Sequence, residues 1–286
     1  MSACGALGTL AASWTPLTDL RGQVSWLRSR SAAPFCVNLV LAFDQRERLA
    51  AVLDAGAPVV SFSWGLDAAL ISMARHARAY VLVQVATVAE ALSAVVAGAD
   101  ALIVQGVEAG GHVEATRPLL ELLREIRPAV DVPLLAAGGI SDAISRDGAR
   151  EAGAAVVACG TVFLAAAEAN VHALYLEHLV NAGAAQTTLT TVFDGGWPDA
   201  PHRVIRNDTV AAWEAVGSPE RGRRPGEGDQ IASRNGQPVL RYDDAQPTRD
   251  TDGDISQMAM YAGTSVEAIS RIEPASHIVK RITRGL

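Results

Sequence analysis

The sequence predicts an α/β fold of repeated strand–helix units, of the kind that closes into a TIM (β/α)8 barrel. Three observations carry this prediction. Short apolar runs recur up to residue 165, segments of helical length separate them, and glycine-rich turns follow several of the runs. Parallel strands that are buried on both faces are typically such near-continuous apolar runs. An open, doubly wound sheet is the alternative, because repetition alone does not establish closure.

Seven runs have the length and composition of strands. They are Gly8–Ala12, Phe35–Leu41, Val59–Ser63, Tyr80–Val85, Ala101–Val104, Leu134–Ala137 and Ala155–Ala158. A closed barrel needs eight strands, so the first strand–helix unit is expected to be missing. A start codon placed too late, a truncated chain, or a later segment that supplies the eighth strand would each explain the count.

Amphipathic or alanine-rich segments of helical length lie between the runs. They are Arg46–Ala55, Val88–Ala97, Arg117–Ile126 and Gly148–Ala152. Three helical segments end in Ala-Gly-Ala, at residues 55–57, 97–99 and 152–154. The glycine of each can take the left-handed conformation that ends a helix.

The pattern changes after residue 165. A helix is expected over Glu168–Asn181, a β-branched strand over Thr187–Val192, a long surface loop or lid over Gly217–Asp254, and helix again over Ile255–Leu286. We expect one domain over residues 1–286 without a second core. Within it, residues 193–258 form an insertion or lid, and residues 259–286 return to the barrel.

Composition excludes several classes of protein. Of the 286 residues, 49% are hydrophobic and 19% charged, which argues against bulk disorder. The net charge of −7 gives no basic field for nucleic acid, and no apolar run is long enough to span a membrane. The three cysteines have neither zinc-site nor disulfide spacing, and His172 and His178 do not share a helical face. We therefore expect a cytoplasmic protein without a leader and without a metal site.

The most informative motif follows the run Ala101–Val104. It carries a carboxylate, two glycines and a histidine, at Glu108, Gly110, Gly111 and His112. Glycines allow close approach of backbone to a ligand, and histidine can move a proton near neutral pH. His112 is therefore predicted to be an active-site residue, the alternative being a helix-starting histidine bonded to a carbonyl. Glu108 could orient it, accept a ligand hydroxyl or cap a turn.

Two further strand ends predict a phosphate cradle. Gly138 and Gly139 end one strand, and Gly160 and Thr161 end the next. In barrels, the loops after the last two strands often bind phosphate through backbone N–H groups and a helix N-terminus. Two tight turns in which glycine serves only geometry are the alternative.

Asn38 and Gln84 are polar residues near the ends of apolar strands. Side chains that point inward there would face the mouth of the barrel, where a flavin ring edge offers donors and acceptors. Structural polar groups that are satisfied within the protein are an equally good reading.

At these residues the chain resembles the nitronate monooxygenase family. The resemblance covers nearly the whole chain and is carried by Gln105–His112, Pro133–Ile140, Gly160–Thr161, Phe193–Pro198, Pro201–Arg203 and Met260–Gly263. It implies a TIM barrel that binds FMN non-covalently and uses no metal. Such enzymes oxidise alkyl nitronates with O₂ to carbonyl compounds and nitrite, through one-electron flavin chemistry.

The resemblance also implies roles for individual residues. His112 would be the catalytic histidine, acting as a base for substrates that still carry the α-proton or as a positive partner of the nitronate. Gly138, Gly139, Gly160 and Thr161 would hold the FMN phosphate, and Asn38 and Gln84 would face the ring. Glu108, Gly110 and Gly111 complete the expected cofactor site.

The chain departs from the family in its missing first strand, in Val113–Ala115 after the histidine, and at Thr264. We expect a chain extended upstream by one strand–helix unit to bind FMN more tightly, and equal affinity would contradict this. FMN-dependent enoyl-acyl-carrier-protein reductases share the Glu108–His112 turn and are the alternative enzyme class. A different alternative is a truncated, non-catalytic barrel, whose apolar surface at the missing strand favours a homodimer or aggregation.

Overall fold

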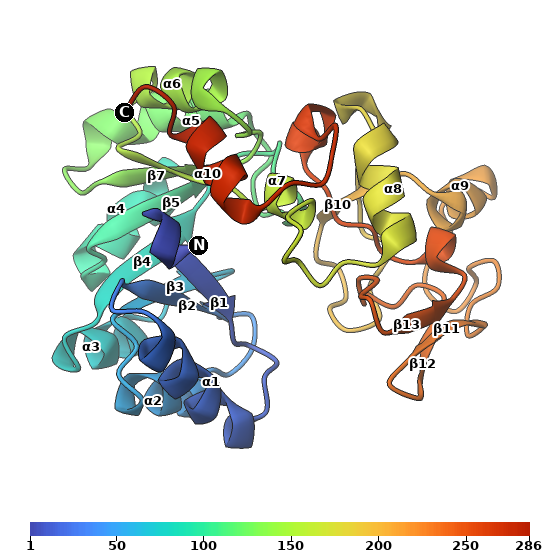
Figure 1. Ribbon diagram of the computed structural model, residues 1–286, viewed down its shortest axis with the longest axis horizontal. Coiled ribbons are helices and arrows are strands. Elements are labelled where there is room, and N and C mark those ends of the chain that lie inside the picture. Colours follow the sequence, from blue (N-terminus) through green and yellow to red (C-terminus); the bar gives the residue numbers. More distant parts are fainter.

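The computed structural model describes residues 1–286, which form two lobes lying side by side (Figure 1). The first lobe is a curved parallel sheet with helices around its convex face. Its strands are β1 (Gly8–Ala11), β2 (Phe35–Val40), β3 (Val59–Ser63), β4 (Tyr80–Val85), β5 (Ala101–Gln105), β7 (Leu134–Ala137) and β8 (Val156–Ala158). Its helices are α1 (Leu17–Arg30), α2 (Arg46–Asp54), α3 (Ala68–His76), α4 (Val88–Ala97), α5 (Leu119–Ile126) and α6 (Ala143–Glu151), with short 3-10 turns η1 (Ser2–Cys4) and η2 (Arg127–Ala129).

The strands of the first lobe follow one another in space in the order β1-β2-β3-β4-β5-β7-β8, and all of them are parallel. This confirms the α/β prediction and all seven predicted strands, within one or two residues at their ends. No pairing joins β1 to β8, so the sheet is a half-barrel of seven strands. Closure into a complete barrel stays a prediction.

Burial on both faces explains why the strands are so apolar. On the convex face, side chains such as Leu39, Phe62 and Leu102 pack with the helices into one cluster of 39 buried residues. On the concave face, Cys36 and Val59 belong to a second, smaller cluster of four buried residues. A strand that contributes to two apolar layers leaves few positions for polar residues.

Local sequence signals begin and end these helices. The Asp67 carboxylate accepts hydrogen bonds from two backbone N–H groups at the start of α3, and Thr87 caps α4 in the same way. The three predicted glycine ends are confirmed, since Gly56, Gly98 and Gly153 have φ of 83°, 103° and 110°. A residue with a Cβ would be strained in this left-handed region.

The second lobe contains residues 165–270 and consists of short elements. They are α8 (Ala173–Asn181), β9 (Thr187–Thr190), β10 (His202–Ile205), α9 (Asp208–Ala215), β11 (Gln230–Arg234), β12 (Gln237–Leu240) and β13 (Thr251–Gly253), with 3-10 turns η3 (Ala184–Gln186), η4 (Ile255–Gln257) and η5 (Thr264–Ala268). In Figure 1, α7 (Thr161–Leu164) lies between the lobes and α10 (Ala275–Ile282) lies against the first lobe. The short β6 (Gly111–His112) pairs with β10 of the second lobe.

Three expectations for this part of the chain were wrong. Residues 217–254 are not only loop, because β11 pairs with both β12 and β13 in an antiparallel sheet. Residues 255–286 are not a continuous helix: only α10 is α-helical there, after two 3-10 turns. The lobe also has apolar clusters of six and four buried residues, and it shares a cluster of 14 with α7 and α10, where no second core was expected.

The C-terminal helix α10 is bonded to α6 of the first lobe, and the return of residues 259–286 to a barrel stays a prediction. The buried Arg146 guanidinium of α6 donates to the carbonyl oxygens of Ile282 at 2.7 Å and Arg284 at 3.0 Å. These bonds satisfy carbonyl oxygens at the end of α10, which have no N–H donor within the helix itself. The last helix is therefore bonded to α6 of the first lobe, while its Ile278 and Ile282 pack in one apolar cluster with Tyr175 of the second lobe.

The open edge at β1 exposes several large apolar side chains. Leu7 is 41% exposed, and Trp26 on the adjacent α1 is 56% exposed. The expected homodimer through this edge stays a prediction. None of the helices combines the length and the apolar character that a membrane span requires. No three His, Cys, Asp or Glu side chains lie close enough together to hold a metal ion.

Candidate active site

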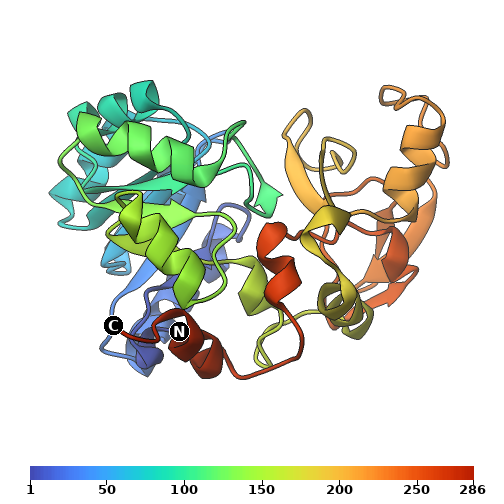
Figure 2. The same cartoon turned by 90° about the horizontal axis from the view of Figure 1, so that it is seen from above.

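His112 lies on β6, a strand of only two residues. Figure 2 shows the two lobes from above, side by side. The chain leaves β5, turns through residues 106–110 and enters β6, which pairs antiparallel with β10 of the second lobe. His112 is opposite His202 in this pairing. The Gln105 amide at the end of β5 donates to the His112 carbonyl at 3.1 Å. The histidine is thus held from both lobes at the carboxyl ends of the parallel strands.

The His112 side chain packs among aromatic rings and makes no hydrogen bond. Its ring stacks on Trp197 at a centroid distance of 4.4 Å, and Tyr261 lies 5.7 Å away. Its Nε2 atom is buried and has no partner. The residue begins no helix and bonds to no carbonyl, so the structural alternative for His112 does not hold. A buried imidazole nitrogen without a partner is rare unless a ligand supplies one.

Burial keeps the His112 imidazole neutral. Desolvation lowers its pKa from 6.5 to about 4, and repulsion from His202 adds to this shift. His202 is itself buried, and its pKa is also lowered by desolvation. Both ring nitrogens of His202 have hydrogen-bond partners, since Nδ1 is 2.9 Å from the Ala200 carbonyl oxygen and Nε2 accepts from the Phe193 N–H at 3.2 Å. Of the two histidines, only His112 has a nitrogen available to take a proton.

Glu108 lies in the same turn, but its carboxylate does not reach the histidine. Both carboxylate oxygens accept from the backbone N–H of Leu119, at 3.0 and 3.2 Å, at the start of α5. Negative charge at this position also suits the helix dipole. Of the three readings of Glu108, the structure favours the cap, and contact with a cofactor stays a prediction.

The two glycines of the turn differ. A Cβ on Gly110 would lie 2.3 Å from the backbone nitrogen of Gly263, so Gly110 is required by close packing of two backbone segments. Gly111 has φ of 76° and nothing within 4 Å of a Cβ built on it. Gly111 therefore keeps an open face toward a ligand, whereas Gly110 has a structural reason of its own.

The predicted phosphate residues lie on adjacent strand ends. Ala137 pairs with Ala158, so the turns that begin at Gly138 and Cys159 are neighbours. The backbone N–H groups of Gly138, Gly139 and Gly160 donate to no acceptor in the protein.

Thr161 and the helix that it begins complete this corner. The Thr161 hydroxyl accepts from the Gly263 N–H at 2.9 Å, which leaves its own hydrogen free. α7 has only four residues, so it adds little dipole at this corner. The free amides and this hydroxyl nevertheless fit an anion such as a phosphate.

Asn38 and Gln84 are both half-buried, on β2 and β4. The Asn38 side-chain oxygen accepts from the Ser61 hydroxyl at 2.9 Å, and its amide donates weakly to Ser63 at 3.4 Å. The Gln84 amide donates to Glu114 at 2.7 Å. Both residues are therefore partly satisfied within the protein, and the carbonyl oxygen of Gln84 has no partner there.

Sequence reasoning missed Glu114 as part of this site. Its Oε2 accepts from Gln84 and, at 3.3 Å, from the backbone N–H of Trp64. Burial raises its pKa. Its own N–H donates to the Gln105 side chain at 2.9 Å. A signal for Glu114 was present, because residues two apart in an extended segment share a face, and Glu114 follows His112 by two.

Trp197 was also missed as a contact of His112. It was noted only as part of a glycine-rich motif, and nothing local in the sequence relates it to a histidine of the first lobe. The contact between Trp197 and His112 therefore depends on the tertiary structure alone.

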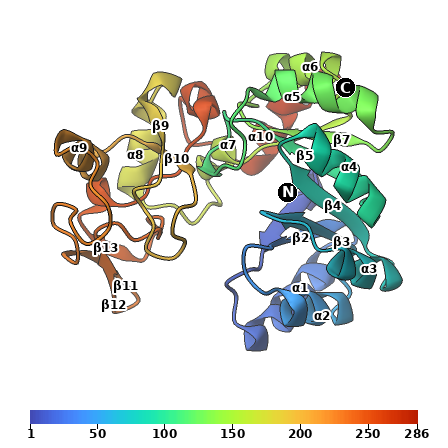
Figure 3. The same ribbon diagram turned by 180° about the vertical axis from the view of Figure 1, so that it is seen from behind.

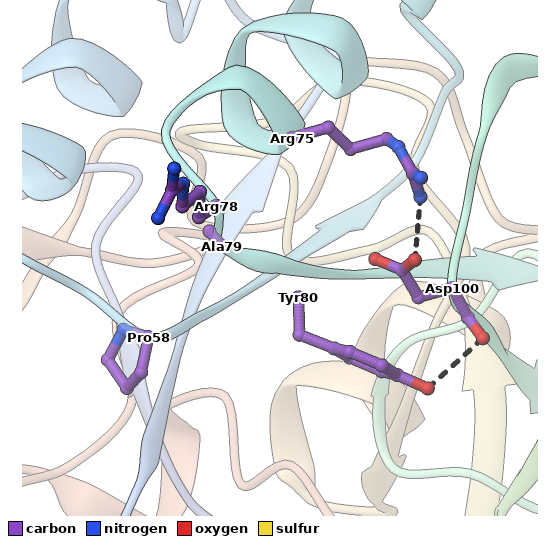
Figure 4. Close-up of a pocket in the computed structure, with 6 residues that line it drawn as sticks. All are labelled: Pro58, Arg75, Arg78, Ala79, Tyr80 and Asp100. Atoms are coloured by element: carbon purple, nitrogen blue, oxygen red, sulfur yellow. Dashed lines mark hydrogen bonds and ion pairs between the residues drawn. The ribbon is translucent and has the colours of Figure 1, made fainter.

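The opposite end of the sheet carries a separate shallow depression of about 300 Å³ (Figure 4). It lies at the amino ends of the strands, and its lining residues are Pro58, Arg75, Arg78, Ala79, Tyr80 and Asp100. Arg75 pairs with Asp100 at 2.6 Å, and the Tyr80 hydroxyl donates to the Asp100 carbonyl. These polar groups satisfy one another, and in parallel half-barrels this end usually serves stability.

The fold and the site together define an α/β half-barrel with a neutral histidine and glycine-rich turns at the carboxyl ends of its strands. The family described as nitronate monooxygenase matches residues 42–285. The chain belongs to this family, which confirms the resemblance seen in the sequence.

Individual relatives differ in their described activities. A "(3aS,4S,5R,7aS)-5-hydroxy-7a-methyl-1-oxo-octahydro-1H-indene-4-carboxyl-CoA dehydrogenase" of Mycobacterium tuberculosis is 34% identical over 221 residues, which are 76% of this chain and 61% of that protein. This chain thus spans less than two thirds of that relative. FabK from Thermotoga maritima superposes with a TM-score of 0.79 at 27% identity, covering 98% of this chain and 85% of FabK. A nitroalkane oxidase from Streptomyces ansochromogenes gives 0.76 at 28% identity, covering 98% and 88%.

Proposed function

We propose that this protein is an FMN-dependent oxidoreductase that oxidises alkyl nitronates with O₂ to a carbonyl compound and nitrite. The observation that carries the proposal is the buried, unpartnered Nε2 of the neutral His112, beside a corner of free backbone amides. Family membership and the likeness to a nitroalkane oxidase support it. O₂ and a small-molecule nitronate are the proposed reactants, and residues 193–258 the proposed lid.

FMN fits the groups that the structure leaves open. The amides of Gly138, Gly139 and Gly160 and the Thr161 hydroxyl would hold its phosphate, and Asn38 and Gln84 would face its ring. FMN would supply the electron transfer from the nitronate to O₂. The apolar concave layer of the sheet would exclude water from beneath the ring.

His112 would convert a neutral nitroalkane into its nitronate by removing a proton. A neutral nitroalkane carries a weakly acidic proton on the carbon next to the nitro group, and an unprotonated imidazole can accept it. Because the pKa of His112 is about 4, the base form is present throughout the physiological range. The neutral state therefore favours His112 as a base over His112 as a positively charged partner of the nitronate.

The test is a comparison of two substrates in the FMN-loaded protein. With neutral nitroethane, His112→Ala should lower kcat/KM at least about 100-fold, since general base catalysis contributes on that order. With preformed ethyl nitronate the loss should be much smaller, because no proton has to be removed. Nitrite release is the readout, and His76→Ala, an exposed histidine of α3, is the matched control. Unchanged nitroethane oxidation by His112→Ala would remove His112 from the mechanism.

A second candidate is an oxidoreductase of acyl thioesters. Its support is the 34% identity to a carboxyl-CoA dehydrogenase, together with the enoyl-acyl-carrier-protein reductase resemblance. Both kinds of substrate carry an acyl group on a phosphopantetheine thiol. Anaerobic NAD(P)H that bleaches the bound flavin without any nitronate present would favour this candidate. A protein that stays colourless after incubation with FMN and desalting would favour the non-catalytic barrel.

A further inference from the structure

Four aromatic side chains extend from His112 along the carboxyl ends of the first three strands. Trp197 stacks on His112, and Trp64 lies 4.6 Å from Trp197 between ring centroids. Phe43 is 5.3 Å from Trp197, and Trp14 is 5.8 Å from Phe43 and 6.2 Å from Trp197. We call Trp14, Phe43, Trp64 and Trp197 the aromatic wall. It is continuous with the histidine through direct ring contacts.

Each lobe contributes to this wall. Trp14, Phe43 and Trp64 follow β1, β2 and β3, whereas Trp197 comes from the second lobe. The carboxyl ends of these strands face the second lobe (Figure 3). This is the edge of a parallel sheet at which substrates bind in α/β enzymes.

The wall offers exposed apolar surface rather than a closed core. Trp197 is 8% exposed, but Trp14 is 57% exposed, and Phe43 and Trp64 are half-buried. A single exposed aromatic side chain is common, whereas a contiguous exposed apolar patch marks a site for a ligand or partner. An indole that is more than half exposed and connected by ring contacts to an active-site histidine therefore points to a ligand.

The backbone of Trp64 is held in an unfavourable conformation. Its φ is 58°, in the left-handed region, where a bulky residue is an outlier. The Glu114 carboxylate accepts its N–H. Strain of this kind gathers at ligand clamps and active sites, where the surrounding contacts maintain it. Glu114 is thus a positioning residue for the wall.

Charge narrows the class of ligand. The two cation–π contacts of the protein are at Trp26 and Tyr242, so no arginine or lysine stacks on any ring of the wall. Stacked faces without a cation suit a flat or ring-shaped neutral group, through offset or edge contacts. A short alkyl chain would leave most of this surface uncovered.

We propose that the aromatic wall binds the non-reacting part of the substrate, and that this part is a neutral ring or fused-ring hydrocarbon. The inference rests on the proposed function in placing the reacting nitronate carbon at His112. Trp14 and Trp64 supply the exposed ring faces, and Trp197 connects them to the histidine. The wall sets substrate specificity and takes no part in the chemical step.

The kinetic test compares a ring-bearing with a short-chain substrate in the holoenzyme. The nitronates of phenylnitromethane and nitroethane are used with wild type, Trp14→Ala and Trp26→Ala. Trp26 is the matched control, since it is 56% exposed and lies on α1 outside the wall. The ratio of kcat/KM for the ring substrate to that for ethyl nitronate should fall about tenfold in Trp14→Ala, mainly through KM, and stay within twofold in Trp26→Ala. A ratio unchanged by Trp14→Ala would overturn the proposal.

A binding test separates this inference from the proposed reaction. Isothermal titration of the full chain with 2-naphthoate and with propanoate uses the carboxylate as a stand-in for the nitronate group. Naphthoate should bind at least tenfold more tightly than propanoate, and Trp14→Ala should remove that preference while Trp26→Ala keeps it. This result without any nitronate turnover would support the wall and reject only the monooxygenase reaction. Equal binding of both acids, or preference for tetramethylammonium over naphthoate, would overturn the ring-binding proposal.

Discussion

The two lobes are held together by different means. The first lobe has one cluster of 39 buried apolar residues between sheet and helices, whereas the second divides its apolar residues among clusters of six and four and a cluster of 14 that it shares with α7 and α10. The second lobe compensates with buried polar contacts. Its Arg224 pairs with Asp194 at 2.8 Å and with Glu227 at 2.6 Å, and lies over the Tyr242 ring. A continuous core gives cooperative stability, while separate clusters allow parts of a lobe to open independently.

The largest expected effect is in the first lobe. Leu102→Ala should lower the free energy of unfolding by about 3 kcal/mol, because it leaves a cavity at a position with no exposed surface. Urea denaturation followed by circular dichroism measures this, and Leu92→Ala, at a 46% exposed position of α4, is the control. Phe193→Ala in the six-residue cluster should instead raise hydrogen exchange only within the second lobe. Equal exchange in both lobes after Phe193→Ala would contradict the comparison.

A smaller effect on stability is expected when the buried ion pairs of the second lobe are removed. Arg224→Met should destabilise that lobe by about 2 kcal/mol, because Asp194 and Glu227 lose the cation that neutralises them. The matched control is Arg206→Met, which removes an exposed ion pair with Glu214 and should cost less than about 1 kcal/mol. Hydrogen exchange of residues 192–227 is the measurement. If the two variants behave alike, the buried pair does not stabilise the lobe.

The last expected effect is of similar size, appears only when the pH is lowered, and concerns the boundary between the lobes. The pKa of His112 is about 4 in the folded protein against an ordinary 6.5, so between these values the unfolded chain binds a proton that the folded chain does not. Stability therefore falls as pH decreases through this range, by about 2 kcal/mol from pH 7.5 to pH 5. His112→Asn should lose this part of the acid sensitivity, whereas His76→Asn should not. Parallel pH profiles of wild type and His112→Asn would show that His112 titrates normally.

Prediction from sequence was most successful where one physical signal dominates. The strands of the first lobe are apolar on both faces, so their runs mark them to within a residue or two. β11 and β12 have no such run, because their small sheet is largely exposed. A signal for this hairpin was available in Asn235-Gly236, whose φ angles of 52° and 75° are those of a tight hairpin turn.

The site was predictable in part for the same reason. His112, Gly138 and Gly160 each follow an apolar strand, so the sequence predicts that they lie at the same edge of the sheet. Local patterns could not show that Trp197 stacks on His112 or that Gly110 packs against Gly263, since these contacts join segments far apart in the chain. These contacts depend on how the second lobe packs against the first, and a local pattern of apolar residues does not predict that packing.

The pairing of β6 with β10 has a consequence for the order of assembly during synthesis. The parallel sheet can form once residues up to about 160 have left the ribosome, since its contacts link sequential units. His112 is different, because its strand partner at His202 and the Gly263 backbone beside its turn are made much later. Until then the histidine turn has no sheet to join. The residue expected to perform the chemistry is therefore among the last to become ordered, and a nascent chain should acquire its fold before it acquires its site.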